Sequence, residues 1–337
     1  MFNVGVVGCG YWGPNLIRNF IQIERSNVLK VVDLNEDRLN HMQSLYPGIK
    51  TSNDYTQLIN DSEIDIIAVA TPVSSHFQIA YDALSSGKHV FVEKPIAASV
   101  AETKSLIGMA DKMGKKLMVG HTFIYTGAVE KMKEIVDSGE LGDIYYISSQ
   151  RLNLGLFQPD INVLWDLAPH DIAIILFLLN QQPTEVSAIG ATHLNPAIED
   201  VAVLSIRFSG NLIAYVQTSW LDPDKVRKMT VVGSKKMMVF DDMQPTEKIR
   251  IYDKGVEIPN HYDTFAEFHY SYKYGDIVIP KLKGSEPLRE ELRHFLNSIE
   301  SDEPLLSDGQ KGLEVIRILE AADQSLKNGN CPIATGV

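Results

Sequence analysis

The chain has 337 residues, 45% of them hydrophobic, and a formal net charge of -12 at pH 7. This length suggests roughly two domains with sizeable cores. The acidic balance, without any basic cluster, argues against nucleic acid and anionic membrane surfaces as partners. No apolar run approaches the roughly 20 residues that span a membrane. We expect a cytoplasmic protein, because the first strand leaves no room for a signal peptide and the two cysteines, Cys9 and Cys331, imply no disulfide framework.

The chain opens on an apolar strand that runs into a glycine-rich turn, and an apolar helical pattern follows. Gly8, Gly10 and Gly13 have the spacing G-x-G-x-x-G. Glycines at this spacing allow a tight turn, a close approach of a pyrophosphate and close packing of the helix on the strand. The helix would direct free N–H groups and the positive end of its dipole at the phosphates. We therefore assign this turn, with Tyr11 and Trp12, to a dinucleotide; the alternative is an ordinary strand-to-helix turn.

An acidic residue follows at the distance that this motif requires. A second strand, over residues 28–32, ends at Asp33, about 20 residues past the last glycine. A carboxylate there accepts hydrogen bonds from the adenosine ribose hydroxyls and repels a 2′-phosphate. The sequence therefore favours NAD over NADP as cofactor; the alternative is a solvated strand end.

The first third of the chain alternates short β-rich runs with helical periodicity. This βα alternation predicts a doubly wound parallel sheet, with ligands beyond the carboxyl ends of its strands. We expect helices over residues 35–46, 54–60, 77–85 and 99–113, and strands over residues 64–69, 89–92 and 116–119.

Two of these strand ends carry candidate cofactor residues. Thr71 and Pro72 follow one strand, with His76 close behind, and Glu93 and Lys94 end the next. The proline that follows Lys94 restricts its backbone to extended conformations, which would help to hold the lysine in place. The alternative for Glu93 and Lys94 is a solvated charge pair.

Past Gly120 the pattern changes, so we place a domain boundary near residues 120–121. Several segments alternate apolar with polar residues, as in an antiparallel sheet with one face in water. We expect an α/β protein with a dinucleotide domain (1–120), a substrate and oligomerisation domain built on a large open antiparallel sheet (121–286), and C-terminal helices that pack back on the first domain (287–337). The expected helix covers residues 127–138, and the strands cover 144–153, 185–192, 201–208, 212–219, 227–232 and 236–240.

The aromatic-rich stretch 259–284 has no clear period and is predicted to be a long loop, over the site or at a subunit contact. Helical patterns over residues 287–300 and 310–327 close the chain. An open sheet with one apolar face needs a cover, which the sheet of a second subunit would supply. We therefore expect a homodimer or a homotetramer.

His170 is the strongest candidate for a base in the second half of the chain. We expect a helix over residues 172–179, with Pro169 in its first turn and His170 at its N-terminus, where the helix dipole opposes protonation. A base that accepts an alcohol proton must be a neutral imidazole. Asp166 would hold this imidazole in one tautomer or cap the helix; the alternative for His170 is a packed core histidine.

Together these motifs resemble the glucose–fructose oxidoreductase / inositol dehydrogenase / MocA family (Gfo/Idh/MocA). They follow the order of that family along nearly the whole chain. The resemblance implies a Rossmann domain joined to an α/β domain with an open antiparallel sheet, and an NAD- or NADP-linked sugar or polyol oxidoreductase. The matching pieces are the glycine turn, Asp33, the segment from Ala70-Thr71-Pro72 to His76, Glu93-Lys94-Pro95, and Asp166 through His170-Asp171.

The resemblance also implies roles for single residues. In this family the lysine of Glu-Lys-Pro and the histidine of Asp-x-x-x-His contact the reacting hydroxyl, and the aspartate supports the site; here these are Lys94, His170 and Asp166. Oxidation of a secondary alcohol needs a base for its proton and a cation for the developing alkoxide. We expect His170 to be the base and Lys94 the cation and proton relay.

The substrate is expected to be a sugar. Tyr125, Arg151 and Trp165 lie beside positions expected to line the cleft, and Arg151, at a strand end, could bind a phosphate or carboxylate or could simply be solvated. The form Trp-Asp-Leu-Ala-Pro-His-Asp resembles the branch that handles nucleotide sugars in polysaccharide, lipid A or amino-sugar pathways. The resemblance implies oxidation of the C3 hydroxyl to a 3-keto sugar.

Three rival functions stay open at this point. The same residues would serve the reduction of a keto sugar or the oxidation of inositol or another polyol. One branch of the resembled family hydrolyses glycosides through transient oxidation by tightly held NAD. Another branch, the galactose-pathway repressor, is a ligand-sensing binding protein, and the intact set of Lys94, Asp166 and His170 argues against that function.

Overall fold

The computed structural model describes residues 1–257 and 271–335, and its internal contacts divide the chain into two compact units. Unit 1 comprises Met1–Thr126 and Ser285–Glu320, and unit 2 comprises Gly127–Gly284 and Ala321–Val337. The division into domains at residues 1–120, 121–286 and 287–337 stays a prediction. Within the described part of the chain, every helix is too short or too polar to cross a membrane.

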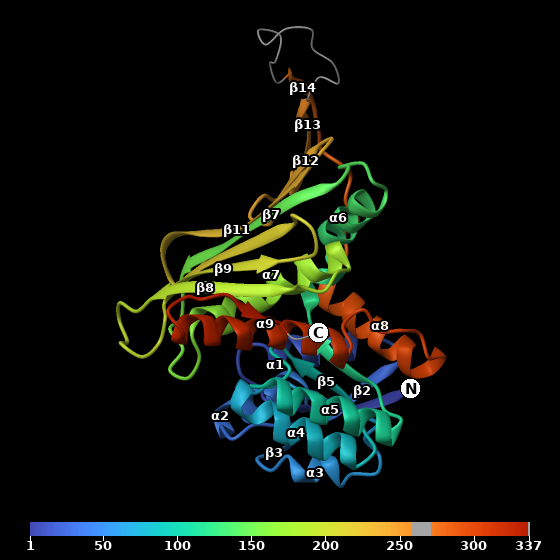
Figure 1. Cartoon of the computed structure of the whole chain (residues 1–337). Helices are drawn as coiled ribbons and strands as arrows, with labels where there is room; N and C mark the ends of the chain where they lie inside the picture. Colours follow the sequence, from blue (N-terminus) through green and yellow to red (C-terminus); the bar gives the residue numbers. More distant parts are fainter. Residues whose placement is uncertain (258–270, 336–337) are drawn as a thin grey trace, which may run out of the picture. The chain divides into compact units, whose positions relative to one another are not determined.

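Unit 1 is built on a six-stranded parallel sheet in the order β3-β2-β1-β4-β5-β6. Figure 1 labels three of these strands, β2, β3 and β5. The order reverses between β1 and β4, which makes the sheet doubly wound, as predicted. Sheets of this kind bind ligands beyond the carboxyl ends of the strands beside the reversal. The strands are β1 (Phe2–Val7), β2 (Ser26–Val32), β3 (Lys50–Ser52), β4 (Ile66–Val69), β5 (His89–Glu93) and β6 (Leu117–Gly120).

Strands β1 and β4 are apolar because they are covered on both faces; Val4, Val6, Ile66 and Ile67 are fully buried. One predicted helix starts too late: α4 begins at Val73, not at residue 77, because its first turn is polar and lacks the apolar period. The helices of unit 1 are α1 (Gly13–Gln22), α2 (Glu36–Leu45), α3 (Thr56–Ile59), α4 (Val73–Ser85), α5 (Val100–Met113), the 3-10 helix η1 (Thr122–Tyr125), α8 (Pro287–Ser301) and the first part of α9 (Gly309–Lys327).

Helix α8 comes from the far end of the chain and packs against α1 and η1 within unit 1. Arg18 Nη2 on α1 lies 2.6 Å from Glu286 Oε1, and Asn19 donates to the same carboxylate at 3.0 Å. Helix α8 is therefore part of the unit that carries the glycine turn.

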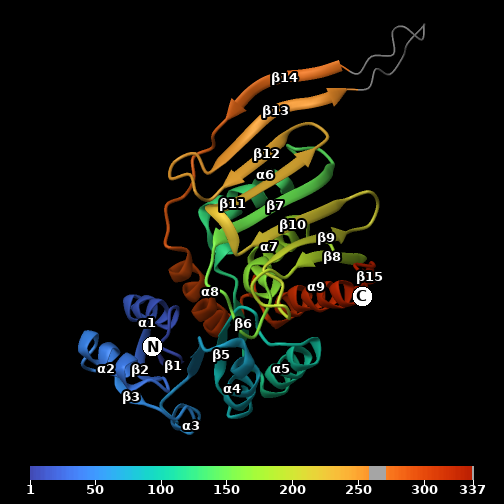
Figure 2. The ribbon, with the colours of Figure 1, turned by 90° about the vertical axis from the view of Figure 1, so that its left-hand side faces the viewer.

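Unit 2 is built on a nine-stranded sheet in the order β14-β13-β12-β11-β7-β10-β9-β8-β15, which Figure 2 shows as a fan. The sheet is mixed, because β10 runs parallel to β7 while the other neighbours are antiparallel. The strands are β7 (Ile144–Leu154), β8 (Glu185–Ala191), β9 (Val201–Arg207), β10 (Ile213–Ser219), β11 (Leu221–Gly233), β12 (Met237–Asp241), β13 (Ile249–Glu257), β14 (Ser271–Val278) and β15 (Ile333–Ala334).

One face of this sheet packs on α7 (Val163–Leu179), which contacts β7, β9 and β10, and α6 (Gly127–Asp137) packs on α7. Leu204 and Val216 are fully buried, whereas Val203 and Tyr215, next to them in sequence, are each 37% exposed. This alternation is the pattern from which the sequence predicted a sheet with one open face.

The predicted loop over residues 259–284 is wrong in its second half. Residues Ser271–Val278 form β14, which pairs with β13 at the edge of the sheet. Most side chains of β14 are exposed, so the strand lacks the buried apolar stripe that reveals a strand in a sequence. Residues 258–270 of the predicted loop lie outside the described residues.

Candidate cofactor and substrate site

The glycine turn brings backbone against backbone at the start of α1. Gly8 has a φ of +99°, and a Cβ on it would lie 2.5 Å from the carbonyl oxygen of Ala70. A Cβ on Gly13 would lie only 1.9 Å from the carbonyl oxygen of Gly8, so α1 starts in contact with the turn, as the spacing predicted.

The first turn of α1 is open to an anion. Its N-cap residue, Trp12, makes no side-chain cap, and the proline after Gly13 stands at the first or second helical position. The Asn15 N–H donates to the Trp12 carbonyl oxygen at 3.0 Å, and a proline has no N–H, so the Gly13 N–H is the group that the start of α1 offers to a phosphate. Tyr11 is 90% exposed, and its ring stacks on Trp12 at 6.3 Å between centroids. The turn thus fits a dinucleotide.

Asp33 closes the other side of the turn. Its Oδ2 accepts a hydrogen bond from the Cys9 N–H at 2.6 Å, and its Oδ1 accepts one from the Asn35 N–H at 2.9 Å. These bonds hold the carboxylate beside the turn with acceptor capacity left for a ribose. The guanidinium of Arg38, on α2, stands 3.6 Å from Asp33 Oδ2 and 3.6 Å from the position of a Cβ on Gly10; the motif did not reveal this cation.

A buried histidine, His76, contacts the segment after β4 through a ring nitrogen. Thr71 is half-buried and Pro72 is exposed at the N-cap of α4. The ring nitrogens of His76 lie 2.8 and 2.7 Å from the carbonyl oxygens of Pro95 and Thr71, and burial lowers the pKa of this ring. His76 therefore ties the ends of β4 and β5 together, and a direct contact of His76, Thr71 or Pro72 with a cofactor stays a prediction.

Glu93 and Lys94 stand at the carboxyl end of β5. Lys94 is half-buried, and its N–H donates to Glu93 Oε2 at 3.3 Å. Glu93 is only 8% exposed, and burial raises the pKa of its carboxyl to about 8, although the charge of Lys94 opposes the shift. A solvated charge pair, the alternative considered for these residues, is therefore wrong for Glu93.

Tyr125, predicted to line the substrate cleft, is a buried residue of unit 1. Its hydroxyl lies 2.9 Å from His294 Nδ1 on α8 and 3.4 Å from Ser307 Oγ. Burial raises the pKa of this phenol above its usual value. The hydroxyl thus contacts α8, and its contact with a substrate stays a prediction.

The helix that carries His170 differs from the prediction. It begins at Val163, and Asn162 caps it by accepting a hydrogen bond from the Trp165 N–H at 3.2 Å. Pro169 lies inside the helix, so His170 is not at its N-terminus and the dipole argument for a neutral imidazole is wrong. Proline is common at helix starts, and here the true cap stands several residues earlier.

The same helix places Asp166 and His170 one turn apart, on one face. Both side chains are half-buried. Asp166 is not the helix cap; its Oδ2 accepts a hydrogen bond at 2.9 Å from the indole N–H of Trp220, which is 1% exposed. Trp220 is thus a support of the aspartate that the motif did not reveal.

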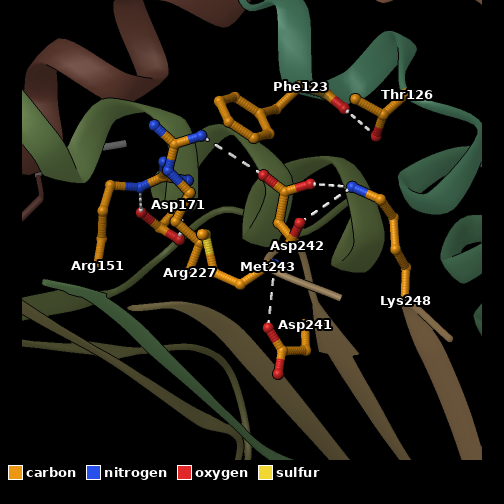
Figure 3. A network of polar contacts seen from close by, with 9 residues as sticks. All are labelled: Phe123, Thr126, Arg151, Asp171, Arg227, Asp241, Asp242, Met243 and Lys248. Carbon is orange, nitrogen blue, oxygen red and sulfur yellow. Dashed lines mark hydrogen bonds and ion pairs between the residues drawn. The ribbon is translucent and has the colours of Figure 1, made fainter. Parts of the chain in front are cut away.

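Arg151 does not end a strand, because β7 continues to Leu154. It is also not solvated: the side chain is buried, and its Nε lies 2.5 Å from Asp171 Oδ2 (Figure 3). Ser149 donates to the same carboxylate at 2.6 Å. The charge of Arg151 is therefore offset by Asp171, the acid that follows His170 in the motif.

A second cation faces the same side of the sheet, since Arg227 on β11 is the register partner of Arg151. Arg227 and Lys248 both contact Asp242, at 3.5 and 2.6 Å (Figure 3).

Trp165, the third predicted substrate residue, is 7% exposed and donates its indole N–H to Asp323 on α9 at 2.9 Å. The indole N–H of Trp165 is thus hydrogen-bonded within unit 2, and only the ring surface would contact a substrate.

Comparison with known proteins agrees with this geometry. Residues 2–121 match the sequence model of an oxidoreductase family with an NAD-binding Rossmann fold, and residues 129–239 match the GFO/IDH/MocA C-terminal domain. The chain belongs to the GFO/IDH/MocA family. It is an oxidoreductase with an NAD-binding Rossmann fold, as the motifs predicted.

Individual relatives are distant but cover the whole length. The uncharacterized oxidoreductase YrbE of Bacillus subtilis is 26% identical over 96% of this chain and 94% of its own. The UDP-N-acetylglucosamine 3-dehydrogenase of Acidithiobacillus ferrooxidans is 25% identical over 93% of each chain. The crystal structure of GenD2 from gentamicin A biosynthesis, in complex with NAD, has the same fold, with a TM-score of 0.84 over 100% of this chain and 97% of that one at 20% identity.

Proposed function

We propose that this protein oxidises a secondary hydroxyl, at C3, of a sugar or nucleotide sugar by hydride transfer to NAD. The observation that carries the proposal is that the glycine turn after β1 and Lys94 after β5 stand at the carboxyl edge of one parallel sheet, where such sheets bind ligands. The choice of C3 and of a nucleotide sugar is supported by the UDP-N-acetylglucosamine 3-dehydrogenase relative.

NAD, when bound, supplies the hydride acceptor. The glycine turn and the Gly13 N–H at the start of α1 would hold its diphosphate, and Asp33 would accept the ribose hydroxyls. The Lys94 ammonium would stabilise the developing alkoxide. His170 would accept the alcohol proton, with Asp166, one helical turn away, orienting its ring.

The other substrate residues have more limited roles in this proposal. Arg151 is offset by Asp171, so an anionic group of the substrate would meet little free charge from it. Arg227 and Lys248, which both contact Asp242, have 34% and 31% of their side chains exposed. Tyr125 and Trp165 would contribute ring surface, since their polar atoms are engaged. The same set would also serve the reverse reduction of a keto sugar.

The test is a screen by NADH absorbance against UDP-, GDP- and dTDP-sugars, free hexoses and inositols. With an accepted substrate, Lys94→Ala should keep the affinity for NAD. Its turnover should fall about 10²–10⁴-fold, because a proton-transfer group usually contributes that much to the rate. Lys104→Ala, at an exposed lysine of α5, is the matched control and should be unaffected. Turnover near wild type in Lys94→Ala would refute the role of the lysine, and the absence of NADH with every compound would refute the function.

A further inference from the structure

A second group of titratable side chains surrounds Glu93 at the carboxyl edge of the unit 1 sheet. His121 follows β6 and Glu291 belongs to α8. Glu93, His121 and Glu291 are 8%, 3% and 0% exposed. Such residues are almost never fully buried unless they are paired, so their burial at this edge needs a reason.

Several polar atoms of these three side chains lack hydrogen-bond partners within the described part of the protein. Oε1 of Glu93, Oε1 of Glu291 and both ring nitrogens of His121 have no hydrogen-bond partner among the described residues. Buried polar atoms without partners are rare in native proteins and tend to mark functional sites. Four such atoms on three neighbouring elements indicate that the cluster has a use beyond folding.

The chain makes room for this cluster. Glu93 is the register partner of Gly120, and a Cβ on that glycine would lie 3.0 Å from Glu93 Oε2. Thr122 donates to Glu291 Oε2 at 2.6 Å, which holds the second carboxyl in place. The indole of Trp12 faces Glu93 in a geometry short of a hydrogen bond.

The charge states of the cluster follow from its burial. Burial raises the pKa of Glu93 to about 8 and that of Glu291 well above its usual value, and it lowers the pKa of His121 to about 4. Lys94 is the cation that acts on both Glu93 and His121, and Tyr125 is the phenol that faces Glu291. A pKa of about 4 leaves the His121 ring neutral near pH 7, and a pKa of about 8 makes Glu93 a group that can titrate near neutral pH.

We propose that Glu93 is the proton site linked to the charge of the cofactor: it releases its proton when NAD⁺ binds and takes one up when the alcohol is oxidised. This rests on the proposed function. A positive nicotinamide at this edge of the sheet favours the Glu93 anion, whereas the neutral ring of NADH does not. In oxidation the alcohol C–H bond breaks, its hydride goes with both electrons to NAD⁺, and a C=O bond forms. The O–H proton, accepted first by His170, would pass through Lys94, the expected proton relay, and end on the Glu93 carboxylate. One positive and one negative charge disappear together, so the net charge of the site is unchanged.

Calorimetry of NAD⁺ and of NADH binding to the whole protein tests this, in buffers that differ in ionisation enthalpy. At about pH 7 we expect NAD⁺ binding to release most of one proton and NADH binding to release far less. Because binding releases a proton, the affinity for NAD⁺ should rise with pH, by at most about tenfold per unit, and level off above about pH 8. Equal proton release for the two cofactors would overturn the proposal.

Two variants identify the group that releases the proton. Glu93→Gln should abolish the release, whereas Glu291→Gln, at the other buried carboxyl of the cluster, should keep it. Proton release that persists in Glu93→Gln, or that is lost only in Glu291→Gln, contradicts the assignment.

If Glu93→Gln does not fold, infrared difference spectra of the wild type decide instead, since NAD⁺ should remove the carbonyl band of one protonated carboxyl. Binding of NAD⁺ without proton release refutes this inference alone, and failure to bind NAD refutes the proposed function as well.

Discussion

At the scale of single residues, we expect Asp33 and Arg38 to decide which dinucleotide the turn accepts. The carboxylate is held by two backbone N–H groups, and the guanidinium stands 3.6 Å away with about half of its side chain exposed. A carboxylate at this position accepts ribose hydroxyls and repels a 2′-phosphate. An arginine beside it would attract that phosphate once the carboxylate is gone.

We therefore expect Asp33→Ala to weaken NAD binding by roughly 10- to 100-fold, the loss of one to two charged hydrogen bonds, and to strengthen NADP binding. Fluorescence titration with both cofactors measures the ratio of the NAD affinity to the NADP affinity. An unfolded variant would lose both affinities and would not invert this ratio. Asp37→Ala, at an exposed acid in the first turn of α2, is the control. Unchanged affinity for NAD would remove Asp33 from the site.

At the scale of elements, α1 depends on glycine at position 13. A methyl group there would overlap the carbonyl oxygen of Gly8, at 1.9 Å, and backbone cannot rotate away as a side chain can. The helix would have to move off the turn, which would displace the N–H groups that face a diphosphate.

Gly13→Ala should thus lose NAD binding and lower the free energy of unfolding by about 1–3 kcal/mol, the usual cost of overpacking. The matched control is Gly108→Ala on α5, where a Cβ meets nothing within 4 Å and helix propensity predicts a gain of about 0.5–1 kcal/mol. Urea unfolding with and without NAD separates the two variants. A Gly13→Ala protein as stable as the wild type would show that the turn tolerates a side chain.

At the scale of the whole molecule, the open face of the unit 2 sheet is unusual for a monomer. Tyr146 and Tyr215 stack on this face at 6.1 Å between centroids, and Val203 and Ile189, register partners on β9 and β8, are 37% and 58% exposed. Exposed apolar side chains gathered on one face of a sheet are a candidate interaction site, and a second copy of the sheet would cover them.

We predict a homodimer or homotetramer whose mass falls toward that of one chain in Val203→Glu, because a buried charge without a partner opposes association. Light scattering after gel filtration measures the mass. Leu45→Glu, at an apolar side chain of α2 that is 53% exposed, should leave the assembly intact. A monomeric wild type at micromolar concentration would contradict the prediction.

Much of unit 1 could be predicted because its signals are local. The glycine spacing, the apolar strands and Asp33 each follow from the chemistry of a few neighbouring residues, and the structure has the predicted parallel sheet. The start of α7 was misplaced because proline marks many helix starts, while its actual cap is Asn162. Strand β14 was missed because an edge strand carries no buried stripe.

The sequence by itself therefore determined the fold class, the cofactor class and the family, since these depend on short motifs and on periodicity along the chain. Only the tertiary structure showed that Arg151 is neutralised by Asp171, that Trp220 holds Asp166, and that Glu291 on a distant helix shares a buried site with Glu93. The reason is physical: burial and the charges of neighbours set the state of an ionisable group, and both depend on residues that the sequence keeps far apart.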